Sequence, residues 1–139
     1  ASRRAGSPGC CMAAWNRELA ALIRGEPVAA AVGVPGAVWD RGDEAEINEA
    51  IHAGNRDLGL AGAFAAAAES IADLRAALAE LPDASLHQPR IAFDGKPGRM
   101  SQLPLLRWVD SCVSLHPAGH LPAVAELLSQ GRGSGSGRD

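Results

Sequence analysis

The stretch that decides the fold, residues 60–82, reads LAGAFAAAAESIADLRAALAELP. Its apolar side chains recur at alternating intervals of four and three residues, which places them along one face of an α-helix. The members of this seam are Leu60, Phe64, Ala67, Ile71, Leu74, Leu78 and Leu81. The alanines beside the seam allow neighbouring helices to approach on several sides. We therefore expect a long helix, ended by Pro82, in a compact bundle rather than an extended coiled coil.

Glycine and proline divide the first part of the chain into further segments. Residues 11–27 carry an apolar stripe at three- and four-residue intervals, which predicts a helix that stops at Gly25. Residues 28–42 contain three glycines and a proline, so we expect an ordered loop that lies against the core. Asp43 is the expected N-cap of a short helix that ends near Gly54.

The last third of the chain combines a long connection with a second apolar seam. Residues 83–100 are expected to form a crossover or to border an active site. A helix capped by Ser101 is predicted over residues 101–130. Its seam consists of Leu106, Val109, Val113, His116, His120, Ala123 and Leu127. A break or kink is expected between His116 and Pro117, because proline costs roughly 3 kcal/mol inside a helix.

The two histidines of this seam carry the clearest chemical signal. His116 and His120 are four residues apart, so their imidazoles project from adjacent turns of a helix and can share one cation. Metal sites in helix bundles are built from such pairs on facing helices. Two buried histidines that hydrogen-bond to backbone or carboxylate groups would leave the same pattern. The spacing alone leaves both interpretations open.

Composition limits the classes of function. The 139 residues correspond to one domain, and the formal net charge of −3 gives no basic surface for nucleic acid. No run approaches the roughly 20 apolar residues of a membrane span. Three cysteines suit a reducing compartment, so we expect a soluble, cytoplasmic protein. Residues 1–9 are expected to be irregular, residues 10–130 to form the domain, and residues 131–139 to be a flexible Gly/Ser tail.

Three segments, taken in order, resemble the DinB-like superfamily. They are AAWNRELAALIRGE at residues 13–26, the helical stretch at residues 43–86, and H-x-x-x-H followed by LPAVAELL at residues 121–128. The sequence is most similar to the branch of DfsB-type proteins and the amino-terminal domains of mycothiol-dependent maleylpyruvate isomerases. The resemblance covers residues 12–130. It implies an all-α, up-down-down-up four-helix bundle that holds one divalent metal, zinc or nickel, with three histidines.

The chain departs from the family pattern at its beginning. His116 and His120 match the two histidines of the family's last helix, but Cys11 stands where the family has its first histidine. Thiolate ligates zinc, so Cys11, His116 and His120 could form a three-ligand site with an open position. The family also has a whole helix before this point, and the Ser, Arg, Gly and Pro of residues 1–10 cannot form it, so one helix is expected to be missing. Alternatively, the residues before Met12 are unrelated sequence from a truncated or frame-shifted beginning, and the metal centre is incomplete.

The resemblance leaves two functions open. In the first, the chain is a small-molecule enzyme, a metal- or thiol-dependent transferase or hydrolase, with its substrate at one end of the bundle. In the second, it is a degenerate, non-catalytic bundle that forms a homodimer or binds a partner through an apolar seam exposed by the missing helix. Cys112 is predicted to be a small buried hydrophobic residue. Trp39 and Trp108 either pack in the core or border a pocket.

Overall fold

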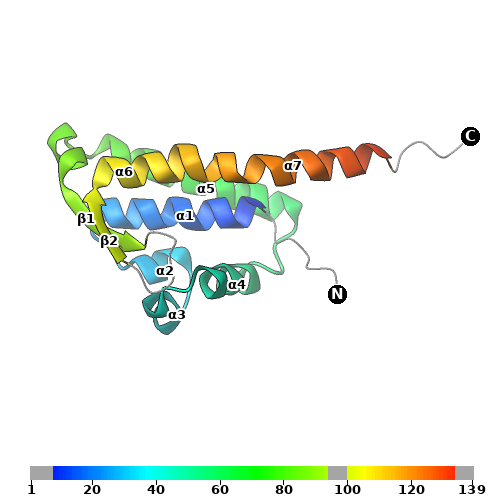
Figure 1. The fold of residues 1–139 in the computed structure, drawn as a ribbon, viewed down its shortest axis with the longest axis horizontal. Helices are drawn as coiled ribbons and strands as arrows, with labels where there is room; N and C mark the ends of the chain where they lie inside the picture. The colour runs from blue at the N-terminus through cyan, green and yellow to red at the C-terminus, as the bar shows by residue number, and fades with distance from the viewer. Residues whose placement is uncertain (1–7, 94–99, 134–139) are drawn as a thin grey trace, which may run out of the picture.

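The computed structural model describes residues 8–93 and 100–133, and these are mostly helical, as the sequence predicts (Figure 1). In chain order the elements are α1 (Pro8–Arg24), α2 (Val28–Val32), α3 (Gly36–Arg41), α4 (Glu44–Gly54), α5 (Leu60–Ala79), a short 3₁₀ helix (Asp83–His87), β1 (Pro89–Phe93), β2 (Met100–Pro104), α6 (Leu105–Asp110), a π-helical turn (Ser111–Leu115) and α7 (His116–Gly133). No helix within the described residues is long and apolar enough to cross a membrane.

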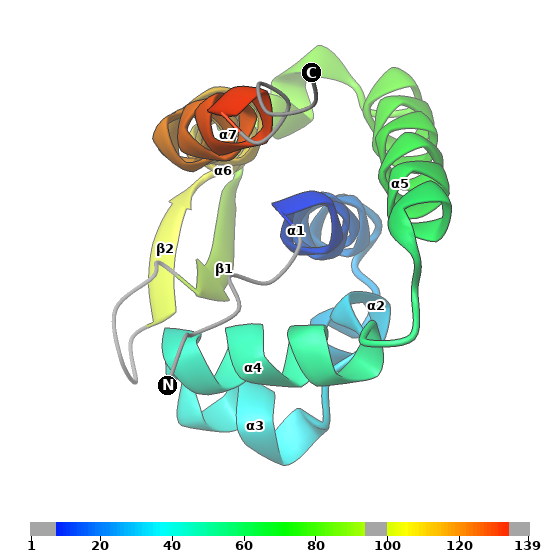
Figure 2. The same cartoon turned by 90° about the vertical axis from the view of Figure 1, so that its right-hand side faces the viewer.

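Three long helical segments run side by side and set the shape of the molecule. Figure 1 shows α1 and α5 running in the same direction and the joined helices α6 and α7 running in the opposite direction. Figure 2 shows the three segments end on, with α4 crossing them on one side. α1 lies between α5 and α6–α7 and contacts both. The two-stranded sheet closes one end of this arrangement.

The apolar core consists of two clusters that both include side chains of α1. Near the start of α1, Trp15 packs with Ile47 of α4 and with Trp39, whose ring centroid lies 6.4 Å from that of Trp15. Further along α1, Leu19 packs with Leu105 and with Leu74 of α5. Buried alanines on α1 leave room for its neighbours, since their side chains end at Cβ. The apolar stripe predicted for this helix is therefore confirmed at Trp15 and Leu19.

Residues 28–42 form two short helices, so the prediction of an ordered loop was wrong. Gly33 ends α2 and Gly42 ends α3, with φ angles of 82° and 61°. Glycine adopts this left-handed conformation without a Cβ clash and therefore commonly ends helices. Gly33, Pro35 and Gly42 lie at the ends of these short helices and do not prevent them from forming. The small apolar side chains of the segment do reach the core, as expected, at Val32 and Val34.

The short helix predicted after Asp43 is confirmed as α4. The Asp43 carboxylate accepts hydrogen bonds from the backbone N–H groups of Ala45 at 2.9 Å and Glu46 at 3.1 Å. These two donors lie in the first turn, where an α-helix has no internal acceptor for them. Asp43 thus fixes the start of the helix that presents Ile47 and Ile51 to the core.

Replacing Asp43 with alanine is expected to lower the free energy of unfolding by about 1 kcal/mol, because two backbone donors lose their acceptor. Urea denaturation followed by circular dichroism measures the change. Asp43→Asn retains an acceptor oxygen at the same position and serves as the matched control. An equal loss of stability in the asparagine variant would show that the side-chain cap is not the cause.

The long helix predicted from residue 60 is confirmed as α5, but its buried face was predicted only in part. Three members of the apolar seam are exposed to solvent, namely Leu60 (73%), Phe64 (68%) and Ile71 (46%). The buried positions are Ala63, Ser70, Leu74 and Ala77. α1 packs on this side because small side chains allow a close approach, and Asn16 donates a hydrogen bond of 3.1 Å to the Ser70 hydroxyl. Of the larger apolar side chains of the seam, Leu60, Phe64 and Ile71 are exposed, whereas Leu74 packs in the core.

The connection predicted over residues 83–100 contains a short 3₁₀ helix and one strand of an antiparallel hairpin. In this hairpin β1 pairs with β2, with Ile91 opposite Gln102. The hairpin is tied to α6, because the Trp108 indole N–H donates to the Arg90 carbonyl at 3.1 Å. Ser101 lies in β2, so it is not a helix cap, and the last helical segment begins at Leu105. The sequence did not predict a strand here, because only one residue of β1, Ala92, is buried among those whose side chains are described.

Of the break or kink predicted near His116 and Pro117, a break does not occur, since the backbone stays helical from α6 through α7, but the helix is distorted just before His116. Residues 111–115 form a π-helical turn in which the His116 N–H donates to the Ser111 carbonyl, five residues earlier. Proline disturbs the hydrogen bonds of the preceding α-helical turn, and a wider turn there accommodates it. Pro122 lies inside α7, which continues to Gly133, into the segment expected to be a flexible tail.

Candidate functional site

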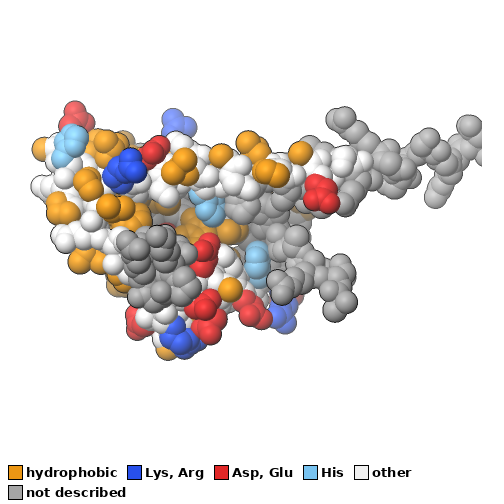
Figure 3. All heavy atoms as spheres, in the orientation of Figure 1, with side chains coloured by type: hydrophobic (Ala, Val, Ile, Leu, Met, Phe, Trp, Pro, Cys, Tyr) orange, Lys and Arg blue, Asp and Glu red, His pale blue; other side chains and the backbone are white. Residues whose placement is uncertain are grey.

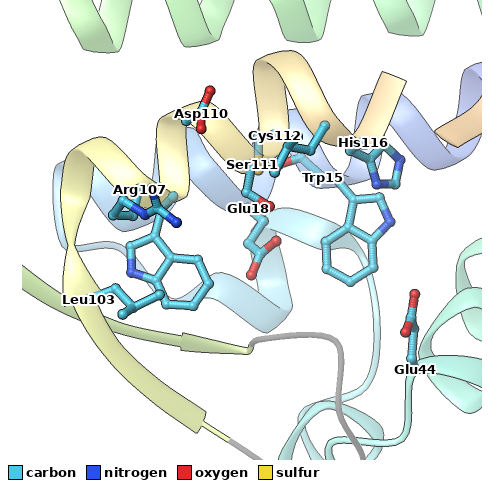
Figure 4. Close-up of a pocket in the computed structure, with 11 residues that line it drawn as sticks. Trp15, Glu18, Glu44, Leu103, Arg107, Asp110, Ser111, Cys112 and His116 are labelled. Atoms are coloured by element: carbon cyan, nitrogen blue, oxygen red, sulfur yellow. Dashed lines mark hydrogen bonds between the residues drawn. The ribbon is translucent and has the colours of Figure 1, made fainter. Parts of the chain in front are cut away.

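A cavity of about 290 Å³ lies between α1, α4 and the α6–α7 segment. Six of its lining side chains can take part in binding or chemistry, and Figure 4 shows them: Trp15, Glu18, Glu44, Arg107, Asp110 and His116. Figure 3 shows the surface hollowed below α6–α7, with acidic side chains gathered below the hollow. Trp39 and Trp108 are both buried in the core, and Trp108 also lines the cavity. Each tryptophan thus packs in the core, which was one of the two predicted alternatives, and Trp108 fits the other alternative as well.

The structure brings together two of the three predicted metal ligands. The Sγ atom of Cys11 on α1 lies 3.9 Å from Nε2 of His116 on α7, although 105 residues separate them in sequence. Cys11 is buried, and its sulfur also accepts a hydrogen bond of 3.2 Å from the indole N–H of Trp15. The Trp15 and His116 rings lie beside each other, with centroids 6.1 Å apart. The Cys11 thiol is 3.7 Å from Oδ1 of Asn48 on α4.

The spacing of Cys11 and His116 fits two ligands of one tetrahedral zinc ion. Zinc lies about 2.3 Å from a thiolate sulfur and about 2.0–2.1 Å from an imidazole nitrogen, so the two donors should be roughly 3.6 Å apart. The observed 3.9 Å is within a few tenths of that value. His120 follows one turn later on α7, but its side chain lies outside the described residues. Among the described side chains no group of three or more His, Cys, Asp or Glu residues could hold a metal.

Glu18 is a further candidate residue of the site, and the sequence patterns did not predict it. Its side chain is only 6% exposed, and it projects from α1 into the cavity (Figure 4). Within the described part of the chain, no donor hydrogen-bonds to its carboxyl group. Burial raises the pKa of Glu18 from 4.5 to about 8, because the charged form loses its hydration. The group is therefore mostly protonated at neutral pH and can donate a proton.

The spacing of α1 contained a signal for Glu18. It lies three residues after Trp15 and four before Leu22, so it shares a helical face with the apolar stripe. A charged residue on the buried face of an amphipathic helix is uncommon, because burial of its charge is unfavourable. The position of Glu18 is therefore a local signal of a functional site, as the histidine pair is.

Cys112 lines the same cavity but is not an activated nucleophile. Burial and the nearby Glu18 raise the pKa of its thiol to about 12. Its Sγ lies 3.9 Å from the Trp15 carbonyl oxygen, which is the acceptor for the thiol proton. The thiolate is the reactive form of cysteine, so a raised pKa makes this side chain unreactive at neutral pH. Cys112 is half-buried, and the predicted reading of a small packing residue agrees with this chemistry.

Comparisons of the chain with protein-family profiles, with curated proteins and with solved structures found no significant match. Membership of the DinB-like superfamily therefore stays a prediction from the sequence.

Proposed function

We propose that this chain is a DinB-like small-molecule enzyme, a metal- or thiol-dependent transferase or hydrolase, whose substrate occupies the cavity beside Cys11 and His116. One observation carries the proposal: the Cys11 sulfur lies 3.9 Å from the His116 imidazole nitrogen, and His116 lines a cavity that also contains a buried carboxyl group. Metal-ligand spacing and a proton donor next to a small-molecule cavity are typical of an active site.

The helix directions are compatible with an up-down-down-up four-helix bundle. α1 and α5 run in one direction and α6–α7 in the other, which is the order of the last three helices in such a bundle. The short crossing helix α4 connects the first pair. In this interpretation, α1 and α7 are the two helices that carry the metal ligands, as they do in the family.

Within the site, each residue has a defined task. Cys11 and His116 would hold the divalent metal, with His120 as the third ligand. When bound, the metal would polarise a substrate oxygen or lower the pKa of a bound water or thiol. The Trp15 N–H fixes the position of the Cys11 sulfur through its hydrogen bond. The Glu18 carboxyl group can give a proton to a substrate in the cavity or take one from it.

A second function is favoured by a different observation, the exposed apolar face of α5. Leu60 and Phe64 are 73% and 68% exposed on this face. Apolar side chains are also exposed along α6–α7 (Figure 3), where Leu115 and Leu121 are 63% and 65% exposed. Contiguous exposed apolar surface is typical of an interface. In this alternative the chain is a non-catalytic bundle that forms a homodimer.

Metal analysis of the purified chain distinguishes the two functions. After expression with added zinc or nickel, we expect about one metal ion per chain by inductively coupled plasma mass spectrometry. Cys11→Ala, His116→Ala and His120→Ala should each lower the content to below about a tenth of an ion, because a site that loses one of three ligands binds weakly.

His87→Ala is the matched control, since His87 is exposed in the short 3₁₀ helix and does not line the cavity. It should leave the metal content unchanged. Full metal content in the His116→Ala chain would contradict the proposed site. A metal-free chain that remains folded and elutes as a dimer would exclude the metal-dependent enzyme and support the second function.

A further inference from the structure

Glu18 is more than nine-tenths buried, and within the described chain no group hydrogen-bonds to its carboxyl oxygens. Among the described residues no fully enclosed side-chain oxygen lacks a hydrogen-bond partner, so the unpaired Glu18 oxygens keep contact with the open space of the cavity. Figure 4 shows the carboxyl group pointing into the cavity, which Trp15 and Trp108 also line. A group that enters the cavity from solvent can therefore reach it.

The other side chains around the cavity favour positive charge. Glu44 and Asp110 add two carboxylates, against the single guanidinium of Arg107. The indole rings of Trp15 and Trp108 form apolar walls, and the face of an indole attracts cations. A carboxylate between aromatic rings is a common arrangement for binding an ammonium group.

We propose that this cavity binds a small organic amine in its protonated form, with the ammonium group hydrogen-bonded to the Glu18 carboxylate and the apolar part against Trp15 and Trp108. The inference deepens the proposed function, on which it rests for the role of the site, by naming the class of substrate. The volume of about 290 Å³ holds a molecule with a single ring or a short chain.

Binding of a cation is then coupled to loss of a proton from Glu18. Without a ligand the carboxyl group is mostly neutral at pH 7, since its pKa is about 8. Only the ionised form attracts the ammonium group, so the apparent affinity should rise about 50-fold between pH 6 and pH 8. The other ionisable or charged groups that line the cavity are Glu44, Arg107, Asp110, Cys112 and His116. Any titration among these groups persists in a Glu18→Gln variant, which isolates the contribution of Glu18.

Three molecules of the same shape test the proposal: benzylamine, benzyl alcohol and benzoate. Isothermal titration calorimetry of the full chain should show binding of benzylamine at least about tenfold tighter than of benzyl alcohol, and none of benzoate. In buffers with different ionisation enthalpies, benzylamine should release about 0.9 protons at pH 7. Glu18→Gln should abolish the preference for the amine, the proton release and the pH dependence.

Glu49→Gln is the matched control, because this exposed carboxylate lies on the same helix as Glu44, α4, but does not line the cavity. It should change the affinity for benzylamine less than threefold. The proposal is overturned if benzyl alcohol or benzoate binds as tightly as benzylamine, if none of the three binds, or if Glu18→Gln keeps the preference. Metal content is measured separately, so failure of this proposal is distinct from failure of the metal-site proposal.

Discussion

Glu18→Gln is expected to stabilise the protein by about 3 kcal/mol at pH 7, although it removes a residue of the candidate site. Burial raises the pKa of this carboxyl group from 4.5 to about 8 in the folded chain, whereas the unfolded chain has the ordinary value. Each unit of pKa difference corresponds to about 1.4 kcal/mol. Glutamine has nearly the same shape and no charge to desolvate, so the variant avoids this cost.

The pH dependence of the effect follows from proton binding. Below about pH 4.5 both states hold the proton, and Glu18 contributes no pH dependence. Between about pH 4.5 and pH 8 only the folded state holds it, so unfolding releases a proton and stability falls by about 1.4 kcal/mol per pH unit. Above pH 8 both states are ionised and the deficit stays constant. The difference between variant and wild type should therefore grow from pH 5 to pH 8 and then level off.

Urea denaturation of both proteins at several pH values measures this difference. Taking the difference removes the contribution of groups that titrate equally in the two proteins. Glu44→Gln, at the exposed rim of the cavity, should change stability by less than about 0.5 kcal/mol at every pH. A difference between the Glu18→Gln and wild-type proteins that does not vary with pH would show that Glu18 is ionised in the folded chain.

Ile47→Ala is expected to lower the free energy of unfolding by about 3 kcal/mol. Ile47 is completely buried where α4 crosses α1, and it belongs to the same cluster as Trp15 and Cys11. Truncation removes apolar contacts and leaves a cavity that the neighbouring rings cannot fill, which typically costs 2–5 kcal/mol. Because this cluster also holds Trp15 beside Cys11, the variant should weaken metal binding as well.

Ile71→Ala is the matched control, since it makes the same chemical change on α5 at a side chain that is 46% exposed. Its cost should be below about 1 kcal/mol. Urea denaturation at a fixed chain concentration gives both values. Similar losses at the two positions would contradict the packing described here. A dependence of the Ile71→Ala effect on chain concentration would instead indicate that α5 lies in a homodimer interface.

The helices could be predicted from the sequence because their signals are local. The cap at Asp43 and the apolar stripe on α1 both depend on residues within one or two turns. Which face of α5 is buried depends on the helix that packs against it. That helix is α1, and it packs against the small side chains around Ser70. β1 carries almost no apolar alternation, so its pairing with β2 could not be read from either strand alone.

The candidate site was predictable to a similar extent. The sequence identified Cys11 and His116, and the structure places them 3.9 Å apart. The sequence alone gives no distance between Cys11 and His116, because this distance depends on how α1 packs against α7. Glu18 was missed because its raised pKa results from burial by other elements, which a single helix pattern does not report. Its position beside the apolar stripe was the only local sign.

The π-helical turn at Ser111–Leu115 determines the rotational phase of everything that follows it. Each residue of an α-helix advances the side-chain direction by about 100°, so the extra residue of a π turn rotates the rest of the helix by about that amount. His116 is the first residue after the turn, and it meets Cys11 in this phase. The distortion that accommodates Pro117 therefore also orients the His116 imidazole toward the Cys11 sulfur.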